Sequence, residues 1–166
     1  MSKLIEVSTN TYNHVFHELV DHRTDNWFLM DTPWTSVVIV AFYLYFVKVA
    51  PRYMKDKPAY NLDKIICVYN LFQIASSAYI VIRAFRYGWG GKYSLICEPT
   101  LKTMWYYYLL KIIDLLDTVF FILRKKQNQV TFLHVFHHSG MVLVGWIWTK
   151  FIPGIYNIFK ISHTLT

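Results

Sequence analysis

Four apolar blocks dominate the chain, and each is close to the length of a helix that crosses a lipid bilayer. They cover residues 33–49, 64–85, 103–123 and 131–152, with short polar stretches between them. About 20 consecutive apolar residues are needed to cross the ~30 Å of hydrocarbon in a bilayer. We therefore predict an all-α fold, a polytopic membrane helical bundle in which each block forms one spanning helix.

Prolines and glycines mark the ends of these blocks. Pro33 opens the first block, where the missing N–H of proline costs least. Pro153 and Gly154 follow the fourth block and predict that its helix ends there. We expect one membrane unit over residues 1–154 and a tail over residues 155–166 that is too short to span. The polar start of the chain argues against a cleavable signal peptide. Its three histidines are expected to be solvated: His14, His17 and His22.

Composition and charge agree with a membrane protein. Of the 166 residues, 55% are hydrophobic and 16% are charged, whereas soluble domains carry about 25% charged residues. The net charge of +7 comes from short loops and not from one continuous stripe, so nucleic acid is not an expected partner. The loops at residues 50–63 and 124–130 are the most basic. By the positive-inside rule they lie on the cytosolic side, and the N-terminus lies on the opposite side.

The third block carries charges that are costly in a membrane. Lys111, Asp114 and Asp117 would each cost roughly 2.5–3.5 kcal/mol near the centre of a lone spanning helix. This helix therefore needs partners, and Lys111 can pair with Asp114 three residues later. In the second block Gln73 lies on one helical face with Asn70 and Ser77, where we expect hydrogen bonds to other helices.

Three histidines begin the fourth block. His134, His137 and His138 have the i, i+3, i+4 spacing that places them on one helical face, within two to three turns of the cytosolic surface. A neutral imidazole is a base and a nucleophile near pH 7, and burial favours the neutral form. Such a cluster suits acyl or proton transfer, and the residues alone do not separate the two. The acidic pair Asp114 and Asp117 would orient the imidazoles if the third and fourth helices are adjacent.

Two other interpretations of the histidines stay open. Membrane di-iron oxygenases and desaturases also use HxxHH boxes, but they need several histidine clusters around two irons, and this chain offers one. The histidines and carboxylates could also simply cross-link helices, although ionisable groups inside membranes are more often functional.

Two motifs resemble those of a known family. KIIDLLDT at Lys111–Thr118 and HVFHH at His134–His138 resemble the Kxx(E/D)xxDT and HxxHH boxes of the fatty acid elongase family, the membrane 3-ketoacyl-CoA synthases. Their order, spacing and place on successive blocks carry the resemblance. The segments APRYMKDKPAYNLDKIICVYN, CEP at Cys97–Pro99 and HHSGMVLVGW also look like family segments. The resemblance runs from about Asp25 to Gly154.

The resemblance implies an acyltransferase of the endoplasmic reticulum membrane, with a seven-helix fold of which about four spans are present. It condenses a long-chain acyl-CoA with malonyl-CoA to a 3-ketoacyl-CoA, without a metal or a bound cofactor. His137 would be the nucleophile, with His138 and His134 tuning it or moving protons. Lys111, Asp114 and Asp117 would organise the site. The phosphates of CoA would be attracted by three basic residues: Arg124, Lys125 and Lys126. Expected partners are the lipid bilayer, both CoA esters, other enzymes of the elongation cycle and a second copy of the chain.

The chain also departs from the family pattern. Family members continue through about three further spans, whereas this sequence stops at Thr166, and the tail from Ile155 resembles nothing expected there. We expect a truncated form that is inactive alone, in which His163 does not replace a missing motif and Cys97 lacks a partner. Two alternatives remain: a non-catalytic membrane fragment that associates with full-length elongases, and a membrane di-iron desaturase or oxygenase.

Overall fold

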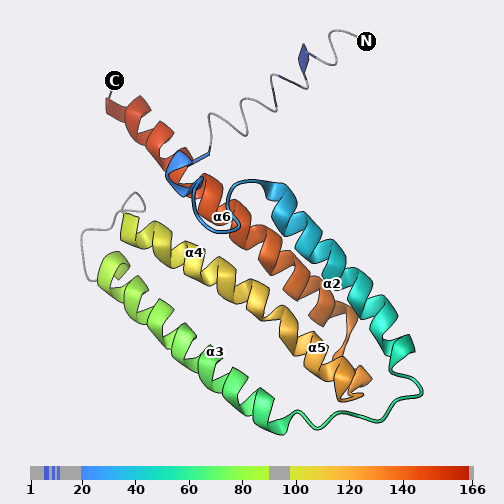
Figure 1. Ribbon diagram of the computed structural model, residues 1–166. Helices are drawn as coiled ribbons and strands as arrows, with labels where there is room; N and C mark the ends of the chain where they lie inside the picture. The colour runs from blue at the N-terminus through green and yellow to red at the C-terminus, as the bar shows by residue number, and fades with distance from the viewer. Residues whose placement is uncertain (1–5, 8, 10, 12–19, 90–97, 165–166) are drawn as a thin grey trace.

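Long helices standing side by side make up the structure, a computed structural model that describes residues 6–7, 9, 11, 20–89 and 98–164 (Figure 1). The side chains at 88–89, 98–99 and 152–164 lie outside this description, as do the predictions for His14, His17, Cys97 and His163. The long helices are α2 (Pro33–Tyr53), α3 (Asp63–Ala84), α4 (Glu98–Ile113), α5 (Leu115–Leu123) and α6 (Phe132–Thr164). The described residues also form short helical turns: η2 (His22–Thr24) before α2, η3 (Phe85–Trp89) directly after α3 and η4 (Gln127–Gln129) between α5 and α6.

The chain is an all-α membrane bundle, as the apolar blocks predicted, and the described residues contain no strand. Within the part of the chain that the structure describes, two stretches are long and apolar enough by themselves to cross a bilayer, Pro33–Tyr53 and Asp63–Tyr87, with mean hydropathies of 1.6 and 1.8. The charged third block does not have the helix length and hydropathy to cross a bilayer by itself. Its charges lie against other helices, where they find partners.

Two helices run further than the sequence analysis predicted. The first extends beyond residue 49 to Tyr53, with Pro51 inside its last turn. The last continues through Pro153 and Gly154 to Thr164, although these two residues were expected to end it. A proline inside a helix removes one backbone hydrogen bond and crowds the carbonyl group four residues earlier, so it often bends or ends a helix. Both helices nevertheless continue past their prolines.

The third block is two helices and not the single helix that was predicted. α4 ends at Ile113 and α5 begins at Leu115, with Asp114 between them. The Asp114 N–H still donates to the Leu110 carbonyl at 2.9 Å, but the Asp117 N–H donates to the Asp114 carbonyl at 3.2 Å in a tighter turn. The Tyr69 hydroxyl of α3 donates to the Ile113 carbonyl at 3.5 Å. A neighbouring helix thus supplies a donor where the helical pattern is interrupted.

α4 and α6 form the centre of the bundle, and Gly145 lets them come close. Tyr108 of α4 is fully buried, and a Cβ atom at Gly145 would lie 3.4 Å from its Cδ2 atom. Small residues at such positions allow helix backbones to approach in membranes. α2 packs against α5 and α6, and α3 packs against α4. The main core cluster comprises Met30, Val40, Tyr43, Tyr108, Leu115, Val142 and Trp146.

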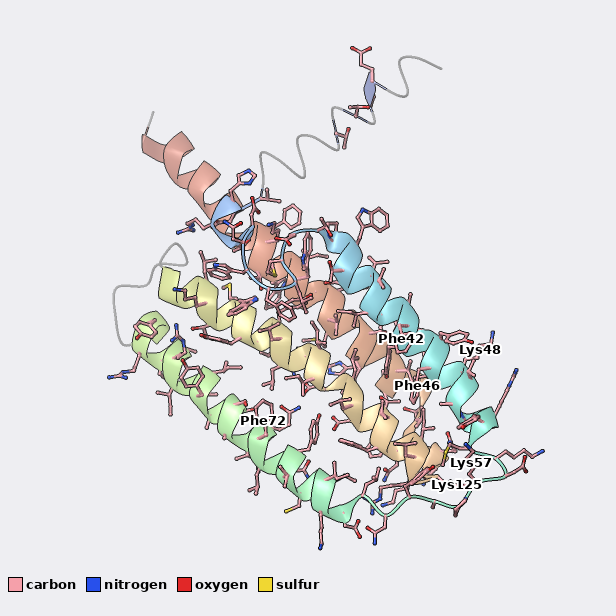
Figure 2. The ribbon with its side chains drawn as sticks, viewed as in Figure 1. Phe42, Phe46, Lys48, Lys57, Phe72 and Lys125 are labelled. Atoms are coloured by element: carbon pink, nitrogen blue, oxygen red, sulfur yellow. The ribbon has the colours of Figure 1, made fainter. Side chains whose placement is uncertain are left out.

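The two most basic loops meet at one end of the bundle. The Tyr60 N–H donates to the Leu123 carbonyl at 3.0 Å. Arg124 forms an ion pair with Asp63 at 2.9 Å, and the Lys125 ammonium group donates to a backbone carbonyl of the first loop at 3.0 Å. Figure 2 shows Lys125 close to the first basic loop at this end. The prediction that these loops share one end is confirmed.

Residues 20–32, which we call the clasp, pack over the opposite end. The Asp21 N–H donates to the Lys150 carbonyl at 2.9 Å, and the almost fully buried ammonium group of Lys150 pairs with Asp25. The indole N–H of Trp105 donates to the Phe28 carbonyl at 3.0 Å. The clasp is therefore a packed part of the bundle.

The clasp aspartates, Asp21 and Asp25, are held in their charged form. Burial alone would raise the pKa of each carboxyl group, but bonds and charges from Arg23, Lys150 and His22 outweigh it and lower both pKa values. His22 is exposed, as predicted, and its ring bonds the Asp25 carboxylate at 2.9 Å. The clasp is thus fixed by charge as well as by packing.

Candidate functional site

Lys111 and Asp114 form an ion pair at the junction of α4 and α5. The Lys111 Nζ atom lies 2.6 Å from Asp114 Oδ2, and the two side chains are only 23% and 15% exposed. The Gln73 side chain of α3 donates to the other carboxylate oxygen of Asp114. The predicted pair at i, i+3 is confirmed, and both oxygens of the carboxylate have a partner.

Gln73 is the member of the predicted polar face on α3 that reaches α4. Its amide nitrogen also donates to the Tyr69 hydroxyl at 2.8 Å, whereas Asn70 and Ser77 are exposed. The Gln73 Oε1 atom is buried without a hydrogen-bond partner among the described residues. One of the three expected interhelical contacts on this face is therefore present.

Asp117 lies one helical turn further along, on α5. Its carboxyl group is partly buried and interacts with the Tyr69 hydroxyl and with the charges of Asp114, His134 and Lys111. Two carboxyl groups and one ammonium group thus lie near one another around the junction of α4 and α5. Such a group of charges is stable in a membrane only where its members pair with one another.

The histidines cluster in the first turns of α6. The Thr131 hydroxyl accepts a hydrogen bond from the His134 N–H at 3.2 Å, which caps the start of the helix. The ring centroids of His134 and His138 are 4.3 Å apart, and those of His137 and His138 are 5.7 Å apart. His134 and His138 are partly buried, and His137 is exposed. The three imidazoles are therefore neighbours, as their spacing predicted, and His137 is the one open to a reactant.

A hydroxyl group, and not a carboxylate, orients the first histidine. The Thr118 Oγ1 atom lies 2.9 Å from His134 Nε2. The Tyr43 hydroxyl lies 2.8 Å from the same Thr118 oxygen. The sequence analysis expected Asp114 and Asp117 to orient the imidazoles, and the hydrogen bond that reaches His134 from α5 comes from Thr118.

The two motifs form a single site. His138 is close enough to Asp114 and Lys111 to interact with both charges, and the ring of His134 lies 5.5 Å from that of Phe121 on α5. Because α5 and α6 are joined by a short basic loop, they pack as neighbours and bring the motifs together. The arrangement places nucleophilic nitrogens beside an ion pair that can hold or move a proton.

An apolar groove of about 440 Å³ lies between α3 and α4. Phe72 and Ile113 line it next to the Gln73 and Asp114 contact, and Tyr79 and Tyr106 line it about two turns away. One end of the groove therefore adjoins the polar site, and its walls are suited to a hydrocarbon chain.

The three basic residues after α5 differ in what they contact. Arg124 pairs with Asp63, and Lys125 donates to the Lys55 carbonyl, so both join the two loops. Lys126 is exposed. Two of the three predicted phosphate-binding residues thus have a structural contact.

Tyr43 and Tyr69 are site residues that the sequence analysis missed. Tyr43 stands in the aromatic run FYLYF, where its neighbours are equally apolar. The signal that marks it is spacing, since Ser36, Val40 and Tyr43 are the buried residues at i, i+4 and i+7 of α2. Among the side chains that the structure describes, no group of three or more histidine, cysteine or acidic residues is placed to hold a metal ion.

Comparison with known proteins gives one consistent result. Residues 28–166 match the profile described as ELO: GNS1/SUR4 family. The chain is 39% identical to very long chain fatty acid elongase 7 of Rattus norvegicus over 146 residues, which is 81% of this chain and 52% of that protein. It is 37% identical to elongase 2 of Mus musculus, covering 80% of this chain and 49% of the relative. It is 36% identical to elongase 4 of Homo sapiens, covering 82% and 47%. The chain spans about half the length of the curated relatives it matches.

Proposed function

The chain belongs to the GNS1/SUR4 family, and from that premise we propose that it acts in fatty acid elongation, at the step that condenses a long-chain acyl-CoA with malonyl-CoA. Its relatives are named very long chain fatty acid elongases. The observation that carries the proposal for this chain is the hydrogen bond between Thr118 and His134 Nε2 at 2.9 Å, because it joins the two motifs into one site.

In the proposed reaction, an imidazole nitrogen of His137 attacks the thioester carbonyl of the acyl-CoA, and the sulfur of CoA leaves as a thiolate that takes up the proton lost from the imidazole ring. The acyl group is then bound to the neutral imidazole. Malonyl-CoA loses carbon dioxide, and its α-carbon attacks the acyl carbonyl. The bond to the imidazole breaks, the released nitrogen takes up a proton, and a 3-ketoacyl-CoA two carbons longer is released.

The side chains around His137 support these steps. His137 is exposed and lies beside His138, so a reactant can reach it while a neighbouring base takes up a proton. In this proposal the Lys111 ammonium group, held by Asp114, stabilises the negative charge that develops on the carbonyl oxygen, and Asp117 keeps the local charge balanced. In this proposal the groove between α3 and α4 receives the hydrocarbon chain, since it leads away from the polar residues.

The orientation in the membrane follows from charge. We assign the end with the two basic loops to the cytosol and the clasp to the lumen of the endoplasmic reticulum. The histidines begin α6 close to the basic end, where the phosphates of CoA would meet Lys126 and the basic residues of the first loop. Partners in the proposal are the bilayer, the two CoA esters and other elongation enzymes.

The test uses the purified chain in liposomes, supplied with acyl-CoA and labelled malonyl-CoA. Labelled 3-ketoacyl-CoA from the unaltered chain, and none from His137→Ala, would overturn the expectation that this form is inactive alone and would support catalysis by His137. The matched control is His22→Ala, which removes an exposed histidine at the other end of the bundle and should leave product formation unchanged.

The outcomes separate the remaining alternatives. If the unaltered chain yields no labelled product, catalysis by this form is refuted, and a role in association with longer relatives takes its place. Metal analysis of the same sample addresses iron chemistry, since one or two iron atoms per chain would contradict the proposal. Labelled acyl-CoA given without malonyl-CoA should leave its acyl group on the protein, and that label should be absent from His137→Ala.

A further inference from the structure

Three side chains from three helices form a line of hydrogen bonds that ends on a histidine. Tyr43 of α2 lies 2.8 Å from Thr118 of α5, and Thr118 lies 2.9 Å from the Nε2 atom of His134 on α6. Thr118 is fully buried and Tyr43 is 4% exposed, so neither hydroxyl group is open to water. The direction of both bonds must therefore follow from the groups themselves.

Counting donors and acceptors fixes that direction. Among the described contacts, the Tyr43 hydroxyl has the Thr118 oxygen as its acceptor. When Thr118 accepts this hydrogen bond, its own hydroxyl group donates a hydrogen bond to His134 Nε2. A proton on His134 Nε2 would reverse the second bond, and either the Thr118 or the Tyr43 hydroxyl would then have no acceptor among these contacts. A buried hydroxyl without an acceptor is unfavourable enough to disfavour that arrangement by roughly tenfold or more.

We propose that Tyr43 and Thr118 are positioning residues that hold neutral His134 with its proton on Nδ1 and its Nε2 lone pair engaged. His134 is then not available as a base, because the lone pair of its Nε2 atom accepts a hydrogen bond from the Thr118 hydroxyl group. Its ring lies 4.3 Å from that of His138, so it fixes the place of the next imidazole. This assignment rests on the proposed function in one respect: it leaves the reaction itself to His137 and His138.

α2 offers a matched control for this line of bonds. Ser36, two turns before Tyr43, also makes a buried interhelical hydrogen bond, to the Tyr108 hydroxyl at 2.7 Å. Tyr43→Phe and Ser36→Ala each remove one such bond between α2 and its neighbours. Only the Tyr43 bond continues to a histidine, so a general loosening of α2 would affect both variants alike.

The experiment is solid-state NMR of the ¹⁵N-histidine-labelled chain in liposomes, near pH 8, where imidazole is neutral. The spectrum shows which ring nitrogen carries the proton, and the signals that vanish in His134→Asn identify His134. We expect Nδ1 to be protonated and Nε2 to be a hydrogen-bonded acceptor. A proton found on Nε2 in the wild-type chain overturns the proposal, whatever the Tyr43 and Thr118 variants show.

The variants test each link. Thr118→Val should give a mixture of both tautomers, and Thr118→Ser, which restores the hydroxyl, should return the wild-type spectrum. Tyr43→Phe should shift the population in the same direction by a smaller amount, and Ser36→Ala should leave it unchanged. An unchanged tautomer in Thr118→Val, or an equal shift in Ser36→Ala, contradicts the proposal.

This readout is independent of turnover. If the chain makes no 3-ketoacyl product but His134 has its proton on Nδ1, the proposed reaction fails and the positioning role stands. If product is formed and the proton is on Nε2, the reverse holds. Where product is formed, Tyr43→Phe should lower kcat several-fold at an unchanged KM, whereas Ser36→Ala should change neither.

Discussion

An ion pair between Lys150 and Asp25 joins α6 to the clasp. Replacing Asp25 and replacing Lys150 should change the stability of the protein by very different amounts. The Lys150 side chain is 5% exposed and that of Asp25 is 44% exposed. A hydrogen bond to a charged group contributes about 1.5–3 kcal/mol, and breaking a fully buried pair costs about 3–5 kcal/mol. Because Asp25 keeps part of its hydration, we expect Asp25→Ala to cost about 2 kcal/mol, roughly a thirty-fold change in the folding equilibrium.

Lys150→Met removes the buried charge and keeps a straight apolar side chain in its place. The remaining Asp25 stays hydrated and bonded to His22, and the backbone bond from Asp21 to the Lys150 carbonyl is unaffected. We expect a change within about 1 kcal/mol, since replacing a buried ion by an apolar group of similar size is often neutral. The double variant should then be no less stable than Lys150→Met.

Unfolding by a denaturing detergent, followed by tryptophan fluorescence, measures all three variants. Trp27 of the clasp and Trp105 of α4 have ring centroids 5.5 Å apart, so release of the clasp changes the surroundings of both. The reasoning is refuted if Lys150→Met costs as much as Asp25→Ala, because the loss would then come from packing and not from an unpaired buried charge. The exposed clasp residue Asn26 serves as the control, and Asn26→Ala should lie within about 0.5 kcal/mol of wild type.

Three further outcomes follow from the same structure. The pKa values of the clasp aspartates are lowered, so their contribution to stability is complete above the ordinary pKa of 3.8 and is lost as the pH falls through the lower folded values. In an acid titration followed by tryptophan fluorescence, the clasp should be released below the ordinary pKa and should stay bound at pH 5–8. Gly145→Ala should be neutral or stabilise the bundle by up to about 1 kcal/mol, since its Cβ would make an ordinary contact with Tyr108. Gly145→Leu should destabilise it by about 1–3 kcal/mol, and an equal effect in the two variants would contradict this account. Gln73→Leu should lower the free energy of unfolding by at most about 1 kcal/mol, because the lost bond to Asp114 is partly offset by removing a buried oxygen without a partner among the described residues. Thermal unfolding in detergent measures this change.

Local contacts were those that the sequence could predict. The Lys111–Asp114 pair follows from a spacing of three residues on one helix, and the clustering of the histidines follows from the same geometry. The shared end of the two basic loops follows from the number of helices between them. Each of these depends on helix periodicity or on counting, which the sequence contains directly.

Contacts between distant residues were the ones that the sequence did not reveal. Lys150 pairs with Asp25 across most of the chain, and Tyr43 reaches Thr118 from another helix. The interruption at Asp114 also depends on a neighbour, because α3 supplies the donor near it. Such features are set by how helices pack, and a single sequence does not specify the packing partners of a polar residue.

The arrangement of the helices also has a consequence for synthesis. α2 and α3 leave the ribosome first, yet they flank opposite sides of the pair formed by α4 and α6 and do not share a main interface (Figure 1). Each enters the membrane while its partners are still being translated, and within the described residues these two helices are long and apolar enough by themselves to cross a bilayer. The charged segment around Asp114 arrives later, when Gln73 is already in the membrane to receive it. The order of the helices along the chain thus lets the least lipid-soluble segment enter a partly built bundle.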